Sequence, residues 1–453
     1  APEVSEFDKY NPFAGYFAAN TESVSPASGT ANVSATDVQL GGIDGLDLAV
    51  RRSYNSAAAE GWYLDRDKTP VIPPYYAFPG GWSLNVARVE ARPDGSYLCI
   101  DEGEVKLEFV TKKDVFFQYH ADLHFSIQKT TVGYSVRMKD GTWYEFNSGG
   151  QVTSKQAPGG KASITYSYTT DNKLDTITDT LGRRVRFNYN AKNHISSINL
   201  LASDGTTTAR TYTYVYTDKM DSQGVVSTVL SGFRDPVNRA TGYEYTEHLV
   251  VTGSAGYTQT AQGPRINSGV KYNRVLLLTK VVYPTGGNSS FHYTVASRAE
   301  PGGSDLYPST TYYHKVFTTG STIRGRAAAY TYTTNYGVNA VFEDTHILSC
   351  LINDGNTKTT ETYGHLYKDY YGTTFEVKDT LYIEDNFVLR KHTYITSLVK
   401  TRVVNTTADV ELETVEYTYD AKWRVVRTET HKQGDTERYT ITTNYRPESE
   451  DNW

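Results

Sequence analysis

The chain has 453 residues, 13% of them aromatic, and its formal net charge at pH 7 is −6. This charge gives no electrostatic basis for binding nucleic acid or an anionic membrane. No stretch approaches the roughly 18 apolar residues of a membrane-spanning helix. The 38 tyrosines, with many threonines and valines, favour strands, and the 36 glycines suit many turns. The composition therefore predicts an all-β chain.

The N-terminal part divides into short predicted elements. Residues 1–23 are polar and aperiodic and predict an irregular lead-in. Residues 33–40 and 46–54 alternate as two strands, because side chains of a strand point to opposite faces in turn. Residues 56–81 are rich in proline and predict a loop, and a strand resumes at Trp82.

The stretch from 141 to 198 contains one unit in about three copies. Each copy has two aromatic residues separated by one residue, with an aliphatic residue six positions after the second aromatic. The second aromatic residues are spaced by 22 and then 21 residues. A fixed period of about 20 residues marks a repeat architecture. The copies are Tyr144-x-Phe146 with Val152, Tyr166-x-Tyr168 with Leu174, and Phe187-x-Tyr189 with Ile195.

Each unit is expected to fold as a β-hairpin with one aromatic face. Strand alternation places both aromatic side chains of a pair on the same face. The segments between the pairs are rich in Asp, Asn and Gly, which favour turns. A lone hairpin is marginally stable in water, so the hairpins must join into a larger sheet.

Turn signals and further aromatic pairs extend the pattern. A connector of Asp, two residues, Gly or Asn, then Arg occurs at Asp179 to Arg183, which includes Gly182, and at Asp235 to Arg239. Asp-Gly pairs, a strong hairpin signal, begin at positions 94, 140, 204 and 354. Further aromatic pairs lie at 212/214, 243/245, 291/293, 330/332 and 417/419.

The period blurs between 296 and 409, where residues 298–305 predict a loop. Long irregular loops carry function more often than the scaffold does. The speculative surface site therefore consists of Tyr313, His314, His346 and His365.

The sequence offers little support for catalysis or metal binding. His120 and His124 would lie about 13 Å apart along a strand, too far for one metal without a bend. Cys99 and Cys350 form no metal or redox motif; two buried thiols are favoured over one disulfide. No zinc-protease, nucleophile-elbow or nucleotide fingerprint occurs. Neither a cofactor nor a metal is expected.

The aromatic faces have two interpretations. They could form a carbohydrate-binding platform, since tyrosine offers a flat apolar ring beside a hydroxyl. They could instead be cross-strand ladders that stabilise the sheet by about 0.2–1 kcal/mol per pair. Their regular recurrence favours ladders, because every repeat needs a ladder and a binding site needs only one patch.

Two parts of the sequence resemble a known family. Tyr417-x-Tyr419-Asp420, followed by Arg424 and an aliphatic pair, resembles the motif of YD-repeat proteins. This Rhs and wall-associated group also includes teneurins and the shell subunits of insecticidal toxin complexes. Trp423 stands where the family has Gly. Residues 24–95 resemble the first segment of bacterial Rhs proteins, through Gly45-Leu46-Asp47-Leu48, Arg52-Ser53-Tyr54-Asn55-Ser56 and Gly80-Gly81-Trp82.

The resemblance implies one continuous, spiralling antiparallel sheet of hairpins that forms a hollow shell or part of one. Residues 24–95 would be the Rhs-type opening segment, 96–295 the YD-repeat shell, 296–409 a divergent β region with loop insertions, and 410–453 a further YD-repeat segment. The family's self-cleavage element, Asp-Pro-x-Gly-Leu, does not occur in this sequence, so self-cleavage is not expected.

The implied function is non-enzymatic. The chain would be a shell segment of a secreted or cell-surface bacterial protein, enclosing or presenting another polypeptide such as a toxin domain. Such a shell would also allow self-association through the sheet rims, since exposed strand edges pair readily. An extracellular glycan- or protein-binding adhesion module is the first alternative. A polysaccharide-degrading enzyme on the same scaffold is the second.

Overall fold

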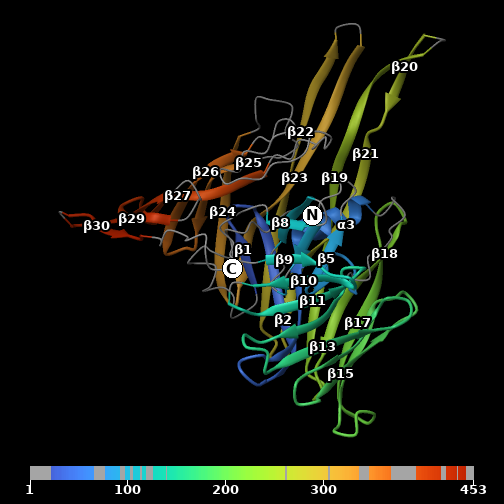
Figure 1. Cartoon of the computed structure of the whole chain (residues 1–453). Helices are drawn as coiled ribbons and strands as arrows, with labels where there is room; N and C mark the ends of the chain where they lie inside the picture. The colour runs from blue at the N-terminus through green and yellow to red at the C-terminus, as the bar shows by residue number, and fades with distance from the viewer. Residues whose placement is uncertain are drawn as a thin grey trace. The chain divides into compact units, whose positions relative to one another are not determined.

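The computed structural model describes most of the chain as two compact units. The first contains residues 30–317, and the second contains residues 318 onward together with residues 25–29. Antiparallel strands dominate the described chain, so the predicted all-β antiparallel class is confirmed (Figure 1). The described residues are 22–65, 77–91, 97–100, 102, 106–112, 115–118, 126–138, 140–260, 263–304, 307–335, 346–368, 394–419, 425–435 and 437–444.

The opening segment forms a small sheet and a helix. Its sheet has the order β1 (Glu22–Ser25), β2 (Thr30–Leu40), β3 (Leu48–Asn55), β4 (Trp82–Leu84). Helix α3 (Ser56–Asp65) follows β3, so the loop predicted for 56–81 is wrong over these residues. The Asn55 Oδ1 accepts hydrogen bonds from the N–H groups of Ala57 and Ala58, at 2.9 and 3.0 Å. An Asn cap before three alanines favours a helix, a signal that the prolines further on obscured.

A second small sheet covers the start of the repeats. It contains β5 (Arg88–Ala91), β6 (Tyr97–Ile100), β7 (Lys106–Lys112) and β8 (Val115–Gln118). The Val89 N–H donates to the Gly150 carbonyl at 2.8 Å, which ties β5 to a repeat turn. Val89 and Cys99 pack with Phe146 and Val152 in one buried cluster.

The repeats form a long antiparallel sheet in which strands pair in chain order, with additional β19–β21 and β19–β23 pairings. The first unit contributes β9 (Ser126–Lys129), β10 (Gly133–Arg137), β11 (Trp143–Asn147), β12 (Val152–Gln156), β13 (Ser163–Tyr168), β14 (Leu174–Thr178), β15 (Arg184–Tyr189), β16 (Ile195–Leu201), β17 (Thr208–Met220), β18 (Val226–Arg234), β19 (Ala240–Thr260), β20 (Gly263–Ser268), β21 (Lys271–Val282), β22 (Asn288–Ser304) and the start of β23 (Tyr307–Ile323).

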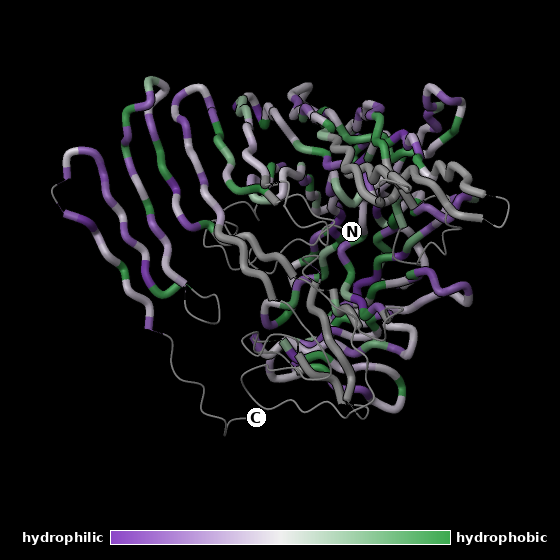
Figure 2. Tube along the Cα trace, turned by 90° about the horizontal axis from the view of Figure 1, so that it is seen from above, coloured by the Kyte–Doolittle hydropathy of each residue, from purple (hydrophilic) through white to green (hydrophobic). Residues whose placement is uncertain are grey.

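The second unit continues the same hairpin pattern. After the end of β23 it contains β24 (Arg326–Asn335), β25 (His346–Asn353), β26 (Thr357–Lys368), β27 (Tyr394–Thr406), β28 (Glu411–Tyr419), β29 (Val425–Lys432) and β30 (Tyr439–Thr442). Hydrophilic and hydrophobic residues intermingle along these strands, as expected for sheets with one apolar face (Figure 2). The prediction of a loop at 298–305 is wrong for residues 298–304, because they extend β22. The domain boundaries at 96, 296 and 410 stay predictions.

In four hairpins that have an aliphatic residue six positions after the aromatic pair, a β-bulge lies at the second aromatic residue. The aliphatic residue six positions later lies directly across the bulge from that aromatic residue. Each bulge adds a local twist and interrupts the regular hydrogen bonds between the strands. The pairs are Phe146 with Val152, Tyr168 with Leu174, Tyr189 with Ile195, and Tyr419 with Val425.

The tyrosine at the second position also bonds to an earlier strand. In the first unit, the carbonyl that accepts its hydroxyl hydrogen belongs to the residue across the preceding bulge. We call these residues the tyrosine ladder. Its donors and acceptors in the first unit are Tyr168 to Val152 (2.8 Å), Tyr189 to Leu174 (2.8 Å), Tyr216 to Ile195 (2.5 Å), Tyr245 to Leu230 (2.7 Å) and Tyr293 to Leu278 (2.7 Å).

The second unit repeats this bond at two places. Tyr332 donates to Thr318 at 2.8 Å, and Tyr419 donates to Val399 at 2.6 Å. Val399 lies across a bulge from Tyr363, so the rule of the first unit holds there. The ladder therefore links hairpins of both units to an earlier strand through side chain and backbone, in addition to the strand pairing, whereas the Tyr363 hydroxyl donates to the Glu361 carboxylate instead.

The Asp-x-x-Gly/Asn-Arg connector is a hairpin turn in which the Asp carboxylate accepts hydrogen bonds from the Arg backbone and side chain. The Asp179 Oδ1 accepts from the Arg183 N–H at 2.8 Å, and the Asp179 Oδ2 accepts from the Arg183 Nε at 2.6 Å. Asp235 and Arg239 repeat both bonds at 2.8 and 2.6 Å. The fourth residue adopts positive φ, which suits Gly182, so the spacing follows from turn geometry.

Candidate functional site

The most unusual buried group in the described chain is a charged pair within the opening segment. Strand β3 alternates, so Arg51 points to solvent while Arg52 points to the apolar face. The Arg52 Nε donates to the Asp37 Oδ2 at 2.8 Å, and the two side chains are 1% and 2% exposed. The Tyr214 hydroxyl donates to the same carboxylate oxygen at 2.6 Å. Burial raises the pKa of the Asp37 carboxyl, and the Arg52 guanidinium opposes that rise.

Four aromatic rings surround the Arg52 guanidinium. Its carbon lies 4.9 Å from the ring centroid of Trp82, 5.0 Å from Phe233, 5.2 Å from Tyr243 and 5.7 Å from Tyr214. One amino group donates to the Tyr243 hydroxyl at 2.7 Å. Each desolvated cation–ring contact stabilises by about 0.5–2 kcal/mol. Trp82 belongs to the opening segment and the other three rings belong to repeat strands, so the cage joins the two.

Further contacts hold the opening segment on this aromatic face. The Trp82 Nε1 donates to the Tyr245 hydroxyl at 2.8 Å, while Tyr245 itself donates to a ladder carbonyl. The Phe78 ring packs edge-on against Tyr214, at 5.0 Å between centroids. The Tyr54 hydroxyl accepts from a backbone N–H of β21 at 3.0 Å. The Tyr245 hydroxyl thus donates its hydrogen to a carbonyl of the repeat strands, and its oxygen accepts a hydrogen bond from the opening segment.

The Arg52–Asp37 pair, its four-ring cage and the contacts of Trp82 and Tyr54 form one docking site. It holds the opening segment against the repeat strands. Arg52 bonds to Asp37 and Tyr243, while its Nη1 is buried without a hydrogen-bond partner among the described residues. The rings of Trp82, Tyr214 and Tyr243 are buried, and the Phe233 ring is half-buried. Among the described residues, no group of three or more His, Cys, Asp or Glu side chains could hold a metal. No helix in that part of the chain is long and apolar enough to cross a membrane. The site itself joins the opening segment to the repeat strands.

The speculative surface site is only partly within the described residues. His314 lies on β23, and its Nε2 is 2.7 Å from the Glu60 Oε1 of helix α3. The backbones of Tyr313, His346 and His365 lie on β23, β25 and β26, but their side chains lie outside the described residues. His120, His124, Asp420 and Arg424 lie outside them entirely. His314 thus joins two elements of the first unit, and a shared site with the others stays a prediction.

Cys99 and Cys350 are both buried and form no disulfide with each other. Burial raises the pKa of the Cys350 thiol to about 12, so the thiol stays protonated at neutral pH. The favoured expectation of two buried thiols holds for the described structure.

Sequence reasoning missed the Arg52 site, although one signal for it exists. Residues 48, 50, 52 and 54 form the apolar face of β3, and Arg52 interrupts this face with a charge. A charged side chain on an apolar face needs a partner of opposite charge or a metal. That partner, Asp37, lies on the neighbouring strand β2.

The chain is similar to solved structures at low sequence identity. No family model matches it, and neither does any curated protein. The crystal structure of TcdB2-TccC3-TEV aligns with a TM-score of 0.31 and 10% identity, over 89% of this chain and 18% of that one. The crystal structure of TcdB2-TccC3 aligns with a TM-score of 0.30 and 9% identity, over 92% of this chain and 19% of that one. The chain spans about a fifth of the length of these structures, and similarity at this level carries no argument about function.

The ladder hydroxyls predict a graded set of mutational effects. We expect Tyr245→Phe to lower the free energy of unfolding of the first unit by about 1–3 kcal/mol for each of two groups, the Leu230 carbonyl and the Trp82 N–H. Tyr189→Phe removes a half-buried hydroxyl that donates to Leu174, and should cost about 1 kcal/mol. Urea titration followed by tryptophan fluorescence measures both. Equal losses would mean that the contact with the opening segment contributes nothing.

Proposed function

We propose that the chain is a non-enzymatic β-shell segment of a YD-repeat protein of the Rhs and wall-associated type, which encloses or presents another polypeptide. The carrying observation is the tyrosine ladder, whose hydroxyls bond hairpins to an earlier strand in both units. A bond rule that recurs along the chain lets a sheet extend without enlarging one core, which a container wall requires.

The opening segment supports this proposal, because it is an example of a polypeptide held on the ladder face. Arg52, Trp82 and Tyr54 bond there to Tyr243, Tyr245 and a backbone amide. The proposed cargo is a polypeptide such as a toxin domain, and the proposed setting is a secreted or surface-delivered bacterial protein. Self-association through the sheet rims belongs to the same proposal.

The buried rings weigh against the carbohydrate platform. Tyr144, Tyr212, Tyr214, Tyr243 and Tyr245 are each less than 9% exposed, so a sugar cannot stack on them. This observation favours the ladder interpretation for the first unit. A polysaccharide-degrading site has no support among the described side chains.

Small-angle X-ray scattering with light scattering for mass tests the shell. We expect a hollow or crescent-shaped particle with a radius of gyration clearly above the roughly 22 Å of a compact globule of this length. A solid, compact monomer would contradict the proposal. A panel of immobilised glycans is the companion measurement, and specific retention would favour the adhesion alternative.

A further inference from the structure

Two backbone residues of the first unit join the ladder and the opening segment at once. Ile195 is the first: its N–H donates to the Ala77 carbonyl at 3.0 Å, and its carbonyl accepts from the Tyr216 hydroxyl at 2.5 Å. The preceding residue, His194, is 7% exposed and stacks on the Tyr216 ring at 5.3 Å. The His194 Nδ1 is buried and has no hydrogen-bond partner among the described residues.

Leu278 is the second such residue. Its N–H donates to the Tyr54 hydroxyl at 3.0 Å, and its carbonyl accepts from the Tyr293 hydroxyl at 2.7 Å. His248 lies edge-on to the Tyr293 ring at 5.7 Å. Its Nε2 is also buried without a hydrogen-bond partner in the described part of the chain. Each junction therefore pairs a ladder tyrosine with a histidine that has a buried, unbonded ring nitrogen.

The charged groups around both histidines offer no ready acceptor for an added proton. Cations adjoin the first junction, and its nearby carboxylates already have partners. At the second junction, β19 and β21 contribute an ion pair, and α3, which packs on β21, carries Glu60 paired with His314. The pairs are Lys192 with Asp218 (2.6 Å), Lys173 with Asp171 (2.5 Å), and Arg274 with Glu247 (3.1 Å), and Lys173 also bonds the Asn193 side chain at 2.8 Å.

We propose that His194 and His248 form an acid-sensitive latch, whose protonation releases the opening segment from the ladder face. A proton on either ring creates a buried cation with an N–H that has no acceptor, and the histidine reaches water only if the tyrosine ring against it moves. Moving that ring breaks its bond to Ile195 or Leu278. These are the residues whose amides hold Ala77 and Tyr54. The latch rests on the proposed function, for which it supplies a means of opening the covered face.

The direction of the pH effect follows from burial. Burial, helped by Lys192 at the first junction, lowers the pKa of His194, and burial lowers the pKa of His248. The released state has ordinary histidines with a pKa of about 6.5, so it binds protons more tightly. The docked state is therefore most stable above about pH 6.5 and loses stability as the pH falls through the lowered values.

Hydrogen exchange measured by mass spectrometry on the intact chain tests the latch. Between pH 7.5 and 5.5, after correction for intrinsic exchange, we expect protection of the Ile195 and Leu278 amides to fall by up to about tenfold at each junction, because pH 5.5 lies about one unit below the ordinary histidine pKa. Amides inside β13 to β15 should keep their protection. The double variant His194→Gln/His248→Gln should keep protection at both junctions at pH 5.5, and His431→Gln, a partly exposed histidine of the second unit, should behave like the wild type.

Unchanged wild-type protection at pH 5.5 would overturn the latch, and so would an equal loss in the double variant. If the double variant fails to fold at pH 7.5, the two single variants decide, because each should protect its own junction and leave the other acid-sensitive. The readout involves no cargo. The latch can therefore fail while the shell proposal stands, and scattering can reject the shell while the acid-dependent release of the opening segment is still observed.

Discussion

Arg52→Ala should lower the free energy of unfolding of the first unit by about 3–5 kcal/mol, among the largest effects of any single substitution in the chain. The substitution leaves the Asp37 carboxylate buried at 2% exposure without its cation. It also empties the centre of the four-ring cage. Urea-induced unfolding, followed by tryptophan fluorescence, measures the change, because Trp82 forms one wall of the cage.

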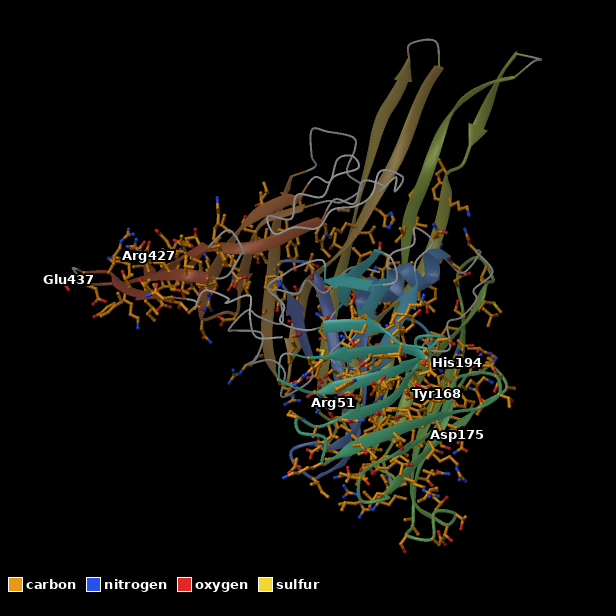
Figure 3. All side chains as sticks on the ribbon, viewed as in Figure 1. Arg51, Tyr168, Asp175, His194, Arg427 and Glu437 are labelled. Atoms are coloured by element: carbon orange, nitrogen blue, oxygen red, sulfur yellow. The ribbon has the colours of Figure 1, made fainter. Side chains whose placement is uncertain are left out.

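Arg51→Ala is the matched control. Arg51, labelled in Figure 3, is the adjacent residue on the same strand. Its side chain is exposed, so its loss should change the free energy by no more than about 0.5 kcal/mol. Both variants lose one positive charge, which separates the cage from any effect of net charge. A loss below about 1 kcal/mol for Arg52→Ala would mean that the buried pair contributes little to docking.

A double substitution separates the ion pair from the packing. Arg52→Met with Asp37→Leu removes both charges and should recover part of the loss, because apolar groups of similar volume often replace a buried pair at little cost. Recovery should be incomplete. The hydroxyls of Tyr214 and Tyr243 then lose their partners, and each unsatisfied group costs about 1–3 kcal/mol.

The repeat and its turns could be predicted from sequence because they are local. The aromatic pair and the aliphatic residue six positions later belong to the two strands of one hairpin, so a single short segment contains the whole pattern. Tyr168 and Leu174 are an example. The Asp179 to Arg183 connector is equally local, since its bonds span four residues. Short-range patterns of this kind carry their own geometry.

The ladder bonds and the Arg52 cage could not be predicted because they join distant segments. The donor Tyr245 and the acceptor Leu230 are 15 residues apart, and the identity of the acceptor depends on where a bulge falls. Arg52 and Tyr243 are 191 residues apart. A single sequence contains the charged residue on the apolar face of β3 but not the identity of the strand that covers it. Strand alternation predicts that Arg52 is buried and needs a partner of opposite charge, but only the fold shows which residues are its partners.

Gly150→Ala should destabilise the first unit far more than Gly182→Ala, although the two glycines occupy the same position of the same turn. Gly150 has φ of 78° and Gly182 has φ of 77°, and each N–H donates at 2.9 Å to the residue three positions earlier. A left-handed conformation costs an alanine about 1–2 kcal/mol at either site. At Gly182 nothing lies within 4 Å of the added methyl group.

At Gly150 the added carbon would lie 1.8 Å from the Val89 carbonyl oxygen, so β5 must move away. Movement breaks the 2.8 Å bond from the Val89 N–H to Gly150 and uncovers Phe146, the first aromatic residue of the bulge series. Urea titration should therefore give Gly150→Ala a loss well above the 1–2 kcal/mol expected for Gly182→Ala, and only Gly150→Ala should speed exchange of the Val89 amide. Equal losses in the two variants would show that β5 adapts without cost. A larger loss for Gly150→Ala would mean that this turn, unlike the equivalent turn at Gly182, forms the contact surface for β5. It would also mean that the close approach of the Val89 carbonyl requires glycine at position 150.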